Sequence, residues 1–170
     1  GPLGYGARST VNGFAGGWLG FGIDEYGNFS TEGGPSGPGR RQQSVAVRGS
    51  GSGTSGYPYL RGACNNGTTN TSGNCLSPTV DNNNVTPAHR YRITIDSKVA
   101  GQSIVKVERN SGAGFVEIIP AFDAAAIGTQ APVPADFLLS LTGSTGGATN
   151  NHEIDNVEIC ALASRPIGVV

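Results

Sequence analysis

Oxygen-bearing side chains in residues 22–30 have the spacing of a small cation site. Asp24 and Asn28 flank a short turn, and the backbone carbonyl of Tyr26 lies between them. A hard cation such as Ca²⁺ takes six or more oxygen ligands, and a carboxylate, a carbonyl and an amide oxygen supply about half of them. Glu32 follows closely enough to fold back and add another. The alternative is an Asx-type turn, in which Asp24 and Asn28 only accept hydrogen bonds from backbone N–H groups.

The other polar residues do not form a recognisable catalytic arrangement. Asp24 and Glu25 are adjacent, and neighbours on a strand point to opposite faces, so these two cannot act as the paired acids of a glycosidase. His89 and His152 have no Ser or Cys nucleophile in a recognisable setting, and we interpret both as ordinary residues at strand ends. The sequence therefore predicts a binding protein and not an enzyme.

The elements that position this turn are expected to be short strands. The chain has 28 Gly and 10 Pro among 170 residues, which disfavours long helices because Gly costs about 1 kcal/mol inside a helix. Short apolar clusters predict strands at 18–23, 44–48, 57–60, 89–95, 103–109, 115–119, 137–142 and 153–161, and one helical turn within 121–127. This pattern predicts one all-β domain over residues 1–170, an antiparallel β-sandwich or jelly roll.

Charge and hydropathy exclude two classes of partner. The formal net charge is -1 and charged residues make up 14% of the chain, so no basic excess is available to neutralise phosphates. We therefore expect no nucleic-acid binding. No apolar run approaches the roughly 18 residues that a spanning helix needs, so we expect no membrane insertion.

Cysteine spacing predicts one disulfide. Cys64 and Cys75 bracket a polar loop of Asn, Gly, Thr and Ser that has nothing else to hold it. A disulfide there would contribute about 2–3 kcal/mol and would indicate an oxidising compartment, hence an exported protein. Cys160 lies in an apolar run and is either a buried thiol or a residue whose partner is outside this chain. The first four residues, Gly1 to Gly4, are either native or a protease-cleavage scar.

Three segments together resemble L-type lectin domains, which are legume-lectin-like or concanavalin A-like. Residues 16–20 are similar to the family's Gly-Gly-x-Leu-Gly segment, and residues 24–28 to its Asp-x-Tyr/Phe-x-Asn metal loop. Residues 140–156 resemble its closing hairpin. The segments occur in the family's order, and with residues 3–5 and 159–161 they are similar to bacterial members found in surface and type IV pilus-associated adhesins. The resemblance implies a concanavalin A-like fold.

The resemblance also implies a calcium site beside a sugar. Asp24, the carbonyl of Tyr26 and Asn28 match the family's calcium positions. The next acidic ligand falls on Gly33, so Glu32 would have to stand in for it.

No transition metal is expected, because Gly22 and Pro38 occupy the positions of its acidic and histidine ligands. In the family the matching Asn also binds the sugar, which makes Asn28 a candidate for both roles. The late glycine-rich turn would line the sugar site or would be a plain hairpin loop. Its candidate sugar-binding residues are Gly146, Gly147, Asn150 and Asn151.

The sequence thus predicts a carbohydrate-binding, lectin-like domain of a bacterial cell-surface or pilus-associated adhesin. The first alternative is a structural or protein-interaction sandwich with a decayed sugar site, in contact with a pilus, a neighbouring domain or another surface protein. A glycoside hydrolase or lyase on the same fold is less favoured. Because the family domain is longer, the resemblance implies that its front strands would lie before Gly1, be supplied by another chain or be rearranged.

Overall fold

The fold is all-β and antiparallel in this computed structural model, which describes residues 2–64, 73–81, 83, 86–136 and 138–161. One sheet has the order β1-β2-β5, formed by β1 (Gly20–Asp24), β2 (Ser44–Arg48) and β5 (Tyr59–Gly62). A second sheet has the order β6-β7-β8, formed by β6 (Arg90–Asp96), β7 (Ile104–Asn110) and β8 (Phe115–Asp123). The strands β3 (Gly51–Ser52) and β4 (Ser55–Gly56) pair as a small hairpin.

Two three-residue 3₁₀ helices complete the regular structure of the described residues. They are η1 (Asn28–Ser30), which follows β1, and η2 (Ala124–Ala126), which follows β8. Asp123 caps η2 by accepting a hydrogen bond from the backbone N–H of Ala125 at 3.0 Å. None of the helices in the described residues has the length and hydrophobicity needed to cross a membrane.

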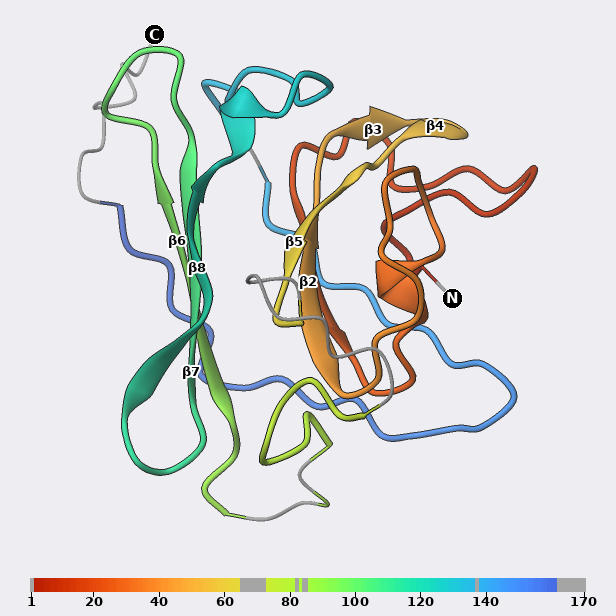
Figure 1. The fold of residues 1–170 in the computed structure, drawn as a ribbon, viewed down its shortest axis with the longest axis vertical. Helices are drawn as coiled ribbons and strands as arrows, with labels where there is room; N and C mark the ends of the chain where they lie inside the picture. The colour runs from red at the N-terminus through yellow and green to blue at the C-terminus, as the bar shows by residue number, and fades with distance from the viewer. Residues whose placement is uncertain (1, 65–72, 82, 84–85, 137, 162–170) are drawn as a thin grey trace, which may run out of the picture.

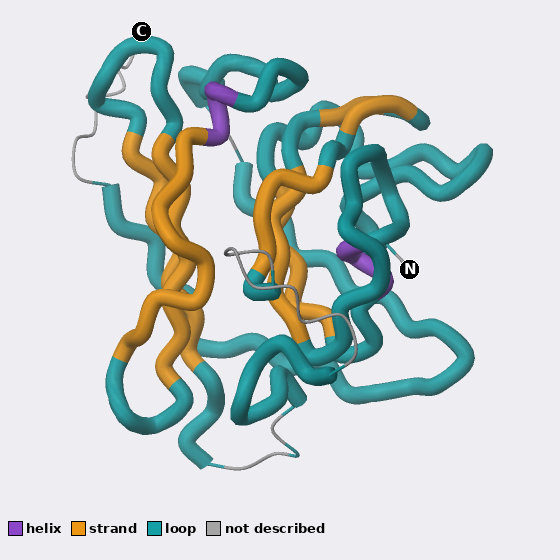
Figure 2. Tube along the Cα trace, viewed as in Figure 1, coloured by secondary structure: helices purple, strands orange, loops and turns teal. Residues whose placement is uncertain are grey.

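The two three-stranded sheets lie side by side as layers and share one apolar core (Figures 1 and 2). This core contains seven buried residues, contributed by β2, β5, β7, β8 and η2: Val45, Val47, Leu60, Val105, Val107, Ile119 and Ala124. Burial of a valine-sized or larger apolar side chain stabilises a fold by about 1.5–3 kcal/mol. The central strand β2 is buried along its whole length because it is covered on both faces.

The second face of the β1-β2-β5 sheet is covered by the N-terminal segment and η1. Phe29, Ala46 and Tyr59 form a buried cluster there, with Leu3 and Tyr5 packed against it. The guanidinium of Arg48 lies within this layer, 5.5 Å from the centre of the Phe29 ring and 5.9 Å from that of Tyr59. The face of β2 that points away from the main core is therefore also shielded from solvent.

Six of the expected strands occur, with shifted ends for most of them. The strand expected at 44–48 matches β2 in both bounds, and β8 extends to Asp123, farther than expected. The helical turn expected within 121–127 is present as η2. The disulfide between Cys64 and Cys75 is confirmed, with the two Cα atoms 5.3 Å apart. The loop it closes falls largely outside the described residues.

The strands expected at 137–142 and 153–161 are wrong. Residues 138–142 and 153–161 have no regular secondary structure, and their apolar side chains are exposed. A strand needs a neighbour for its backbone hydrogen bonds, and no such neighbour pairs with these segments in the part of the chain that the structure describes. Cys160 is an exposed free thiol, so the first of its two expected roles, a buried thiol, is wrong, and a partner outside this chain stays a prediction.

Candidate functional site

The turn after β1 is fixed by Asp24, the last residue of that strand. Its carboxylate is buried and accepts a hydrogen bond from the backbone N–H of Phe29 at 2.5 Å between N and Oδ2. The Phe29 ring lies directly over Gly22, where a Cβ atom would collide with it. Gly22 is thus required for close packing of η1 on β1. Asp24 therefore accepts a backbone N–H as the Asx-type alternative expects, although the donor lies five residues farther along the chain.

The other predicted calcium ligands lie along and after this turn. Tyr26 is exposed, and the guanidinium carbon of Arg40 lies 4.7 Å from the centre of its ring. Asn28 begins η1, and its carbonyl accepts a hydrogen bond from the backbone N–H of Glu32 at 2.7 Å. Gly27 has a φ of 97°, a conformation that favours glycine.

No group of three or more His, Cys, Asp or Glu side chains suited to a metal occurs among the described residues. The calcium site predicted from the sequence is not of that kind, because two of its ligands are the Tyr26 carbonyl and the Asn28 amide oxygen and not acidic, His or Cys side chains. One carboxylate oxygen of Asp24 is occupied by the Phe29 N–H. Calcium binding stays a prediction.

The late glycine-rich loop lies against the turn after β1. The side-chain amide of Asn150 donates a hydrogen bond to the Glu25 carboxylate, with 3.0 Å between Nδ2 and Oε2. The Thr142 hydroxyl donates to the carbonyl of Leu3 at 2.7 Å, which holds the beginning of this loop. The structure therefore brings together two segments that are more than a hundred residues apart in sequence.

The predicted sugar-binding residues of this loop face solvent. Gly146 and Gly147 are exposed and have open space where a side chain would project. Asn151 is exposed too, and its backbone N–H donates to the Asn150 side-chain carbonyl at 2.8 Å. The backbone groups of this loop are thus accessible to a ligand.

Glu25 lies in the candidate site although the sequence predicts no binding role for it. Its carboxylate accepts the Asn150 hydrogen bond, and its backbone carbonyl accepts one from the N–H of Gln43 at 2.8 Å. Nothing in the sequence pairs Glu25 with Asn150, because the contact depends on where residues 138–150 cross the molecule. An acid adjacent to a predicted ligand was the only available signal.

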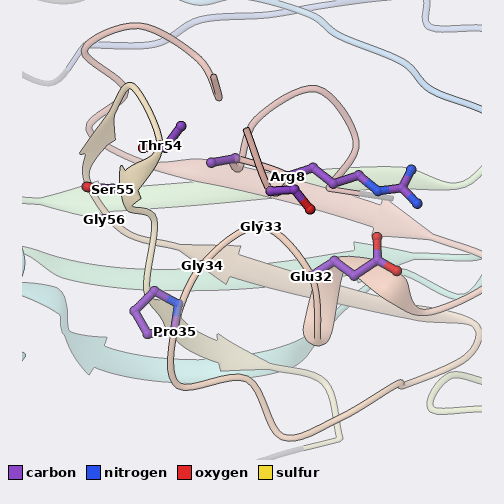
Figure 3. A pocket seen from close by; sticks show the side chains of 10 residues that line it. Arg8, Glu32, Gly33, Gly34, Pro35, Thr54, Ser55 and Gly56 are labelled. Carbon is purple, nitrogen blue, oxygen red and sulfur yellow. The ribbon is translucent and has the colours of Figure 1, made fainter. Parts of the chain in front are cut away.

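A separate hollow of about 590 Å³ opens beside the 32–35 loop (Figure 3). Its lining combines charged, hydroxyl and glycine positions, contributed by Arg8, Glu32, Gly33, Gly34, Thr54, Ser55 and Gly56 among others. The backbone N–H of Ala7 donates to the Gly33 carbonyl at 3.1 Å and joins two of its walls. The structure thus places Glu32 at this hollow, which the sequence did not predict.

Arg48 joins η1 to Tyr57, the residue that follows β4. It is fully buried, and it donates from Nε to the Phe29 carbonyl at 2.8 Å and from Nη1 to the Tyr57 carbonyl at 2.7 Å. Burial lowers the pKa of Arg48 to about 10. Burial also raises the pKa of Tyr59 to about 12, although nearby arginines favour its ionised form. Both groups are structural, since neither reaches the exposed turn.

His89 takes no part in the candidate site. It immediately precedes β6, and its ring nitrogens lie 3.2 and 3.3 Å from Nη2 of the buried Arg109. Burial lowers the pKa of His89, and the positive charge of Arg109 adds to that effect. Its position at the beginning of a strand agrees with the expected ordinary role.

No protein-family model, curated protein sequence or solved structure matches this chain. The arrangement offers carboxylate, amide and backbone groups on two adjoining exposed loops, with an exposed aromatic ring at Tyr26.

Proposed function

We propose that this chain is a carbohydrate-binding, lectin-like domain with a concanavalin A-like β-sandwich fold. The observation that carries the proposal is the hydrogen bond from Asn150 to Glu25. It joins the late glycine-rich loop to the 24–28 turn, and these are the two segments that the lectin resemblance assigns to one sugar site. Shallow polar sites of this kind bind hydroxyl-rich ligands through amide, carboxylate and backbone groups.

The proposed binding surface extends from Tyr26 and Asn28 across to residues 146–151. The exposed Tyr26 ring supplies an apolar platform, and the loop glycines leave room for a ligand to approach the backbone. Glu25 orients Asn150 and so sets where its amide can meet a sugar hydroxyl. Calcium at Asp24, Tyr26 and Asn28 would order the turn beside the sugar, and Glu32, which lines the neighbouring hollow, would have to turn towards it to be the fourth ligand.

The proposed setting is an exported bacterial surface or pilus-associated adhesin. The Cys64–Cys75 disulfide supports an oxidising compartment, because such bonds persist mainly outside the cytosol. The layering of two antiparallel sheets on one core supports the sandwich. The partner in this proposal is a glycan.

The test is a glycan array probed with the labelled chain and two variants. Asn28→Ala removes the side chain assigned to both calcium and sugar, and we expect it to abolish binding to every glycan that the parent retains. Asn12→Ala is the matched control, because Asn12 is an exposed asparagine outside the proposed surface. Equal retention by all three proteins, or none by the parent, would contradict the proposal.

Calcium is tested separately by thermal melting. We expect millimolar Ca²⁺ to raise the melting temperature and EDTA to lower it, because a ligand that binds only the folded state stabilises that state. An unchanged melting temperature in both conditions would remove calcium from the proposal and leave a metal-independent sugar site.

A second candidate function is a protein-interaction module. It is favoured by the leucines of the 138–141 segment, because Leu138, Leu139 and Leu141 are all exposed. Exposed apolar clusters of this kind are typical of contact surfaces with other proteins. In that case the glycan array would be blank while the chain still bound a protein partner.

A further inference from the structure

The apolar core is open to solvent along one strand, β6. Ile93 pairs with Val107 and Ile95 pairs with Val105, and directly opposite residues of an antiparallel pair share a face. Both valines are completely buried in the core, so both isoleucines point to the same inner face. Ile93 and Ile95 nevertheless remain 43% and 38% exposed. Tyr91 of β6 packs against the core, but the core layer covers Ile93 and Ile95 only in part.

The facing sheet is open at the corresponding edge. Ile23 of β1 pairs with the buried Val45 and so faces inward, yet it is 41% exposed. The Phe21 and Tyr91 rings, with centroids 5.9 Å apart, bring β1 and β6 together at one end. Within the described residues, β1 and β6 each form an edge of their sheet. We call Ile23, Ile93 and Ile95 the open seam.

A second uncovered apolar segment lies near the C-terminus. Residues 154–160, which we call the arm, have no regular secondary structure. Val157 and Ile159 are 55% and 73% exposed, and their spacing of two places both side chains on one face of an extended chain. The arm therefore has the sequence of a half-buried strand, but among the described residues no sheet covers Val157 and Ile159.

Charge favours the match between the arm and β6. Glu158 alternates with Val157 and Ile159 and so projects from the opposite face of an extended arm. On β6, Arg90 and Arg92 alternate with the inward residues, and both are exposed; Arg92 also pairs with Glu108 of β7 at 3.5 Å. If the arm paired with β6 with its apolar face inward, Glu158 would lie on the same outer face as these arginines. Opposite charges on adjacent strands stabilise a pairing.

We propose that the arm of a second copy of this chain adds as a strand to the free edge of β6. Val157 and Ile159 of the arriving arm cover Ile93 and Ile95, and its backbone pairs with the edge of β6. In the structure each chain leaves its own Val157 and Ile159 exposed, so the arm is available for exchange. Two copies that exchange arms make the same contact twice, which gives a closed two-fold dimer.

The first test is the oligomeric state of the full chain by size-exclusion chromatography with light scattering. All proteins carry Cys160→Ser, so that an adventitious disulfide through this exposed thiol cannot produce the dimer. We expect a dimer at micromolar concentration and a monomer for Val157→Asp/Ile159→Asp. Leu138→Asp is the matched control, because Leu138 is 93% exposed but lies outside the arm, and it should stay dimeric.

A charge exchange tests the pairing itself. Glu158→Lys should weaken dimerisation at least about 10-fold, and adding Arg92→Glu to it should restore most of the affinity. A parent that is monomeric at 200 μM (roughly the top of the range where specific dimers assemble) would overturn the proposal. A dimer that survives the arm substitutions would overturn it as well. So would a monomer whose arm amides are protected from hydrogen exchange, because that result means that the chain's own arm covers the seam.

The dimer does not depend on glycan binding. Val157→Asp/Ile159→Asp leaves Tyr26, Asn28 and residues 146–151 unchanged, so the variant should keep its glycan array pattern if the lectin proposal holds. A dimer that binds no glycan would therefore contradict only the lectin proposal. A monomer that binds glycans would contradict only the dimer proposal.

Discussion

Arg48→Met should be among the most destabilising single substitutions in this chain. The guanidinium is fully buried, and its two hydrogen bonds join η1 to the segment after β4 through the carbonyls of Phe29 and Tyr57. Methionine fills much of the volume but leaves both carbonyls without a donor, at a cost of about 1–3 kcal/mol each. Relief of the buried charge offsets part of this loss, since Nη2 has no partner in the described residues. We expect a net loss of about 3 kcal/mol.

For a chain of this length that loss corresponds to about 6–12 °C in melting temperature. Differential scanning calorimetry at pH 7 measures it directly, with urea unfolding as an independent check. Arg61→Met is the matched control, because Arg61 lies on the neighbouring strand β5 and is exposed. Arg48→Lys retains the charge without the two-pronged geometry, so it should also be destabilised. A loss of less than about 1 kcal/mol in the free energy of unfolding for Arg48→Met would refute the claim that Arg48 stabilises the fold by joining these segments.

Three further predictions concern other parts of the fold. Replacement of Cys64 and Cys75 by serine should lower the free energy of unfolding by about 2–3 kcal/mol while a single cooperative transition remains, because the shared core lies outside that loop; a non-cooperative melt would show that the loop is part of the core. Stability should fall as the pH rises from 10 towards 12, because Tyr59 stays protonated to about 12 when folded but ionises near 10 when unfolded, and Tyr59→Phe should flatten that fall in pH-dependent urea titrations. Gly22→Ala should destabilise the chain and perturb the near-ultraviolet circular dichroism, because its Cβ would collide with the Phe29 ring; a neutral effect would mean that η1 does not pack on β1 as described.

The sequence was most informative where alternation and burial agree. The alternating apolar residues of β2 and β7 predicted both strands to within one residue, because one face of each packs on the shared core. The disulfide also followed from local sequence, since Cys64 and Cys75 close a short polar loop. Such signals depend on a few neighbouring residues and need no knowledge of the rest of the fold.

The errors arose where alternation was present without a partner strand. Residues 137–142 and 153–161 have the pattern of strands, but a strand also needs an edge to pair with, and sequence pattern does not report that. The apolar run around Cys160 also suggested a buried thiol as one of two alternatives, and that thiol is exposed. In both cases the local pattern showed which side chains are apolar, but it did not show whether the fold buries them.

The parts of the candidate site have different origins, and its assembly could not be predicted. Residue type and spacing single out Asp24 and Asn28, whereas the late loop with Asn150 is implied only by the lectin resemblance. The contact between Asn150 and Glu25 joins segments whose distance is set by the path of the chain across the molecule. The role of Gly22 was also not visible, because only the position of the Phe29 ring explains why no side chain fits there.

The most direct test of the sugar-binding proposal is a two-dimensional ¹⁵N NMR titration of the chain with a glycan retained on the array. The proposal predicts that the amide signals of Gly27, Asn28, Gly146, Gly147 and Asn150 shift together and saturate with one dissociation constant. Signals from β7, on the far sheet, should not move. Saturable shifts confined to the residues that line the hollow beside the 32–35 loop, or no saturable shifts at all, would contradict the placement of the sugar between the 24–28 turn and the late loop.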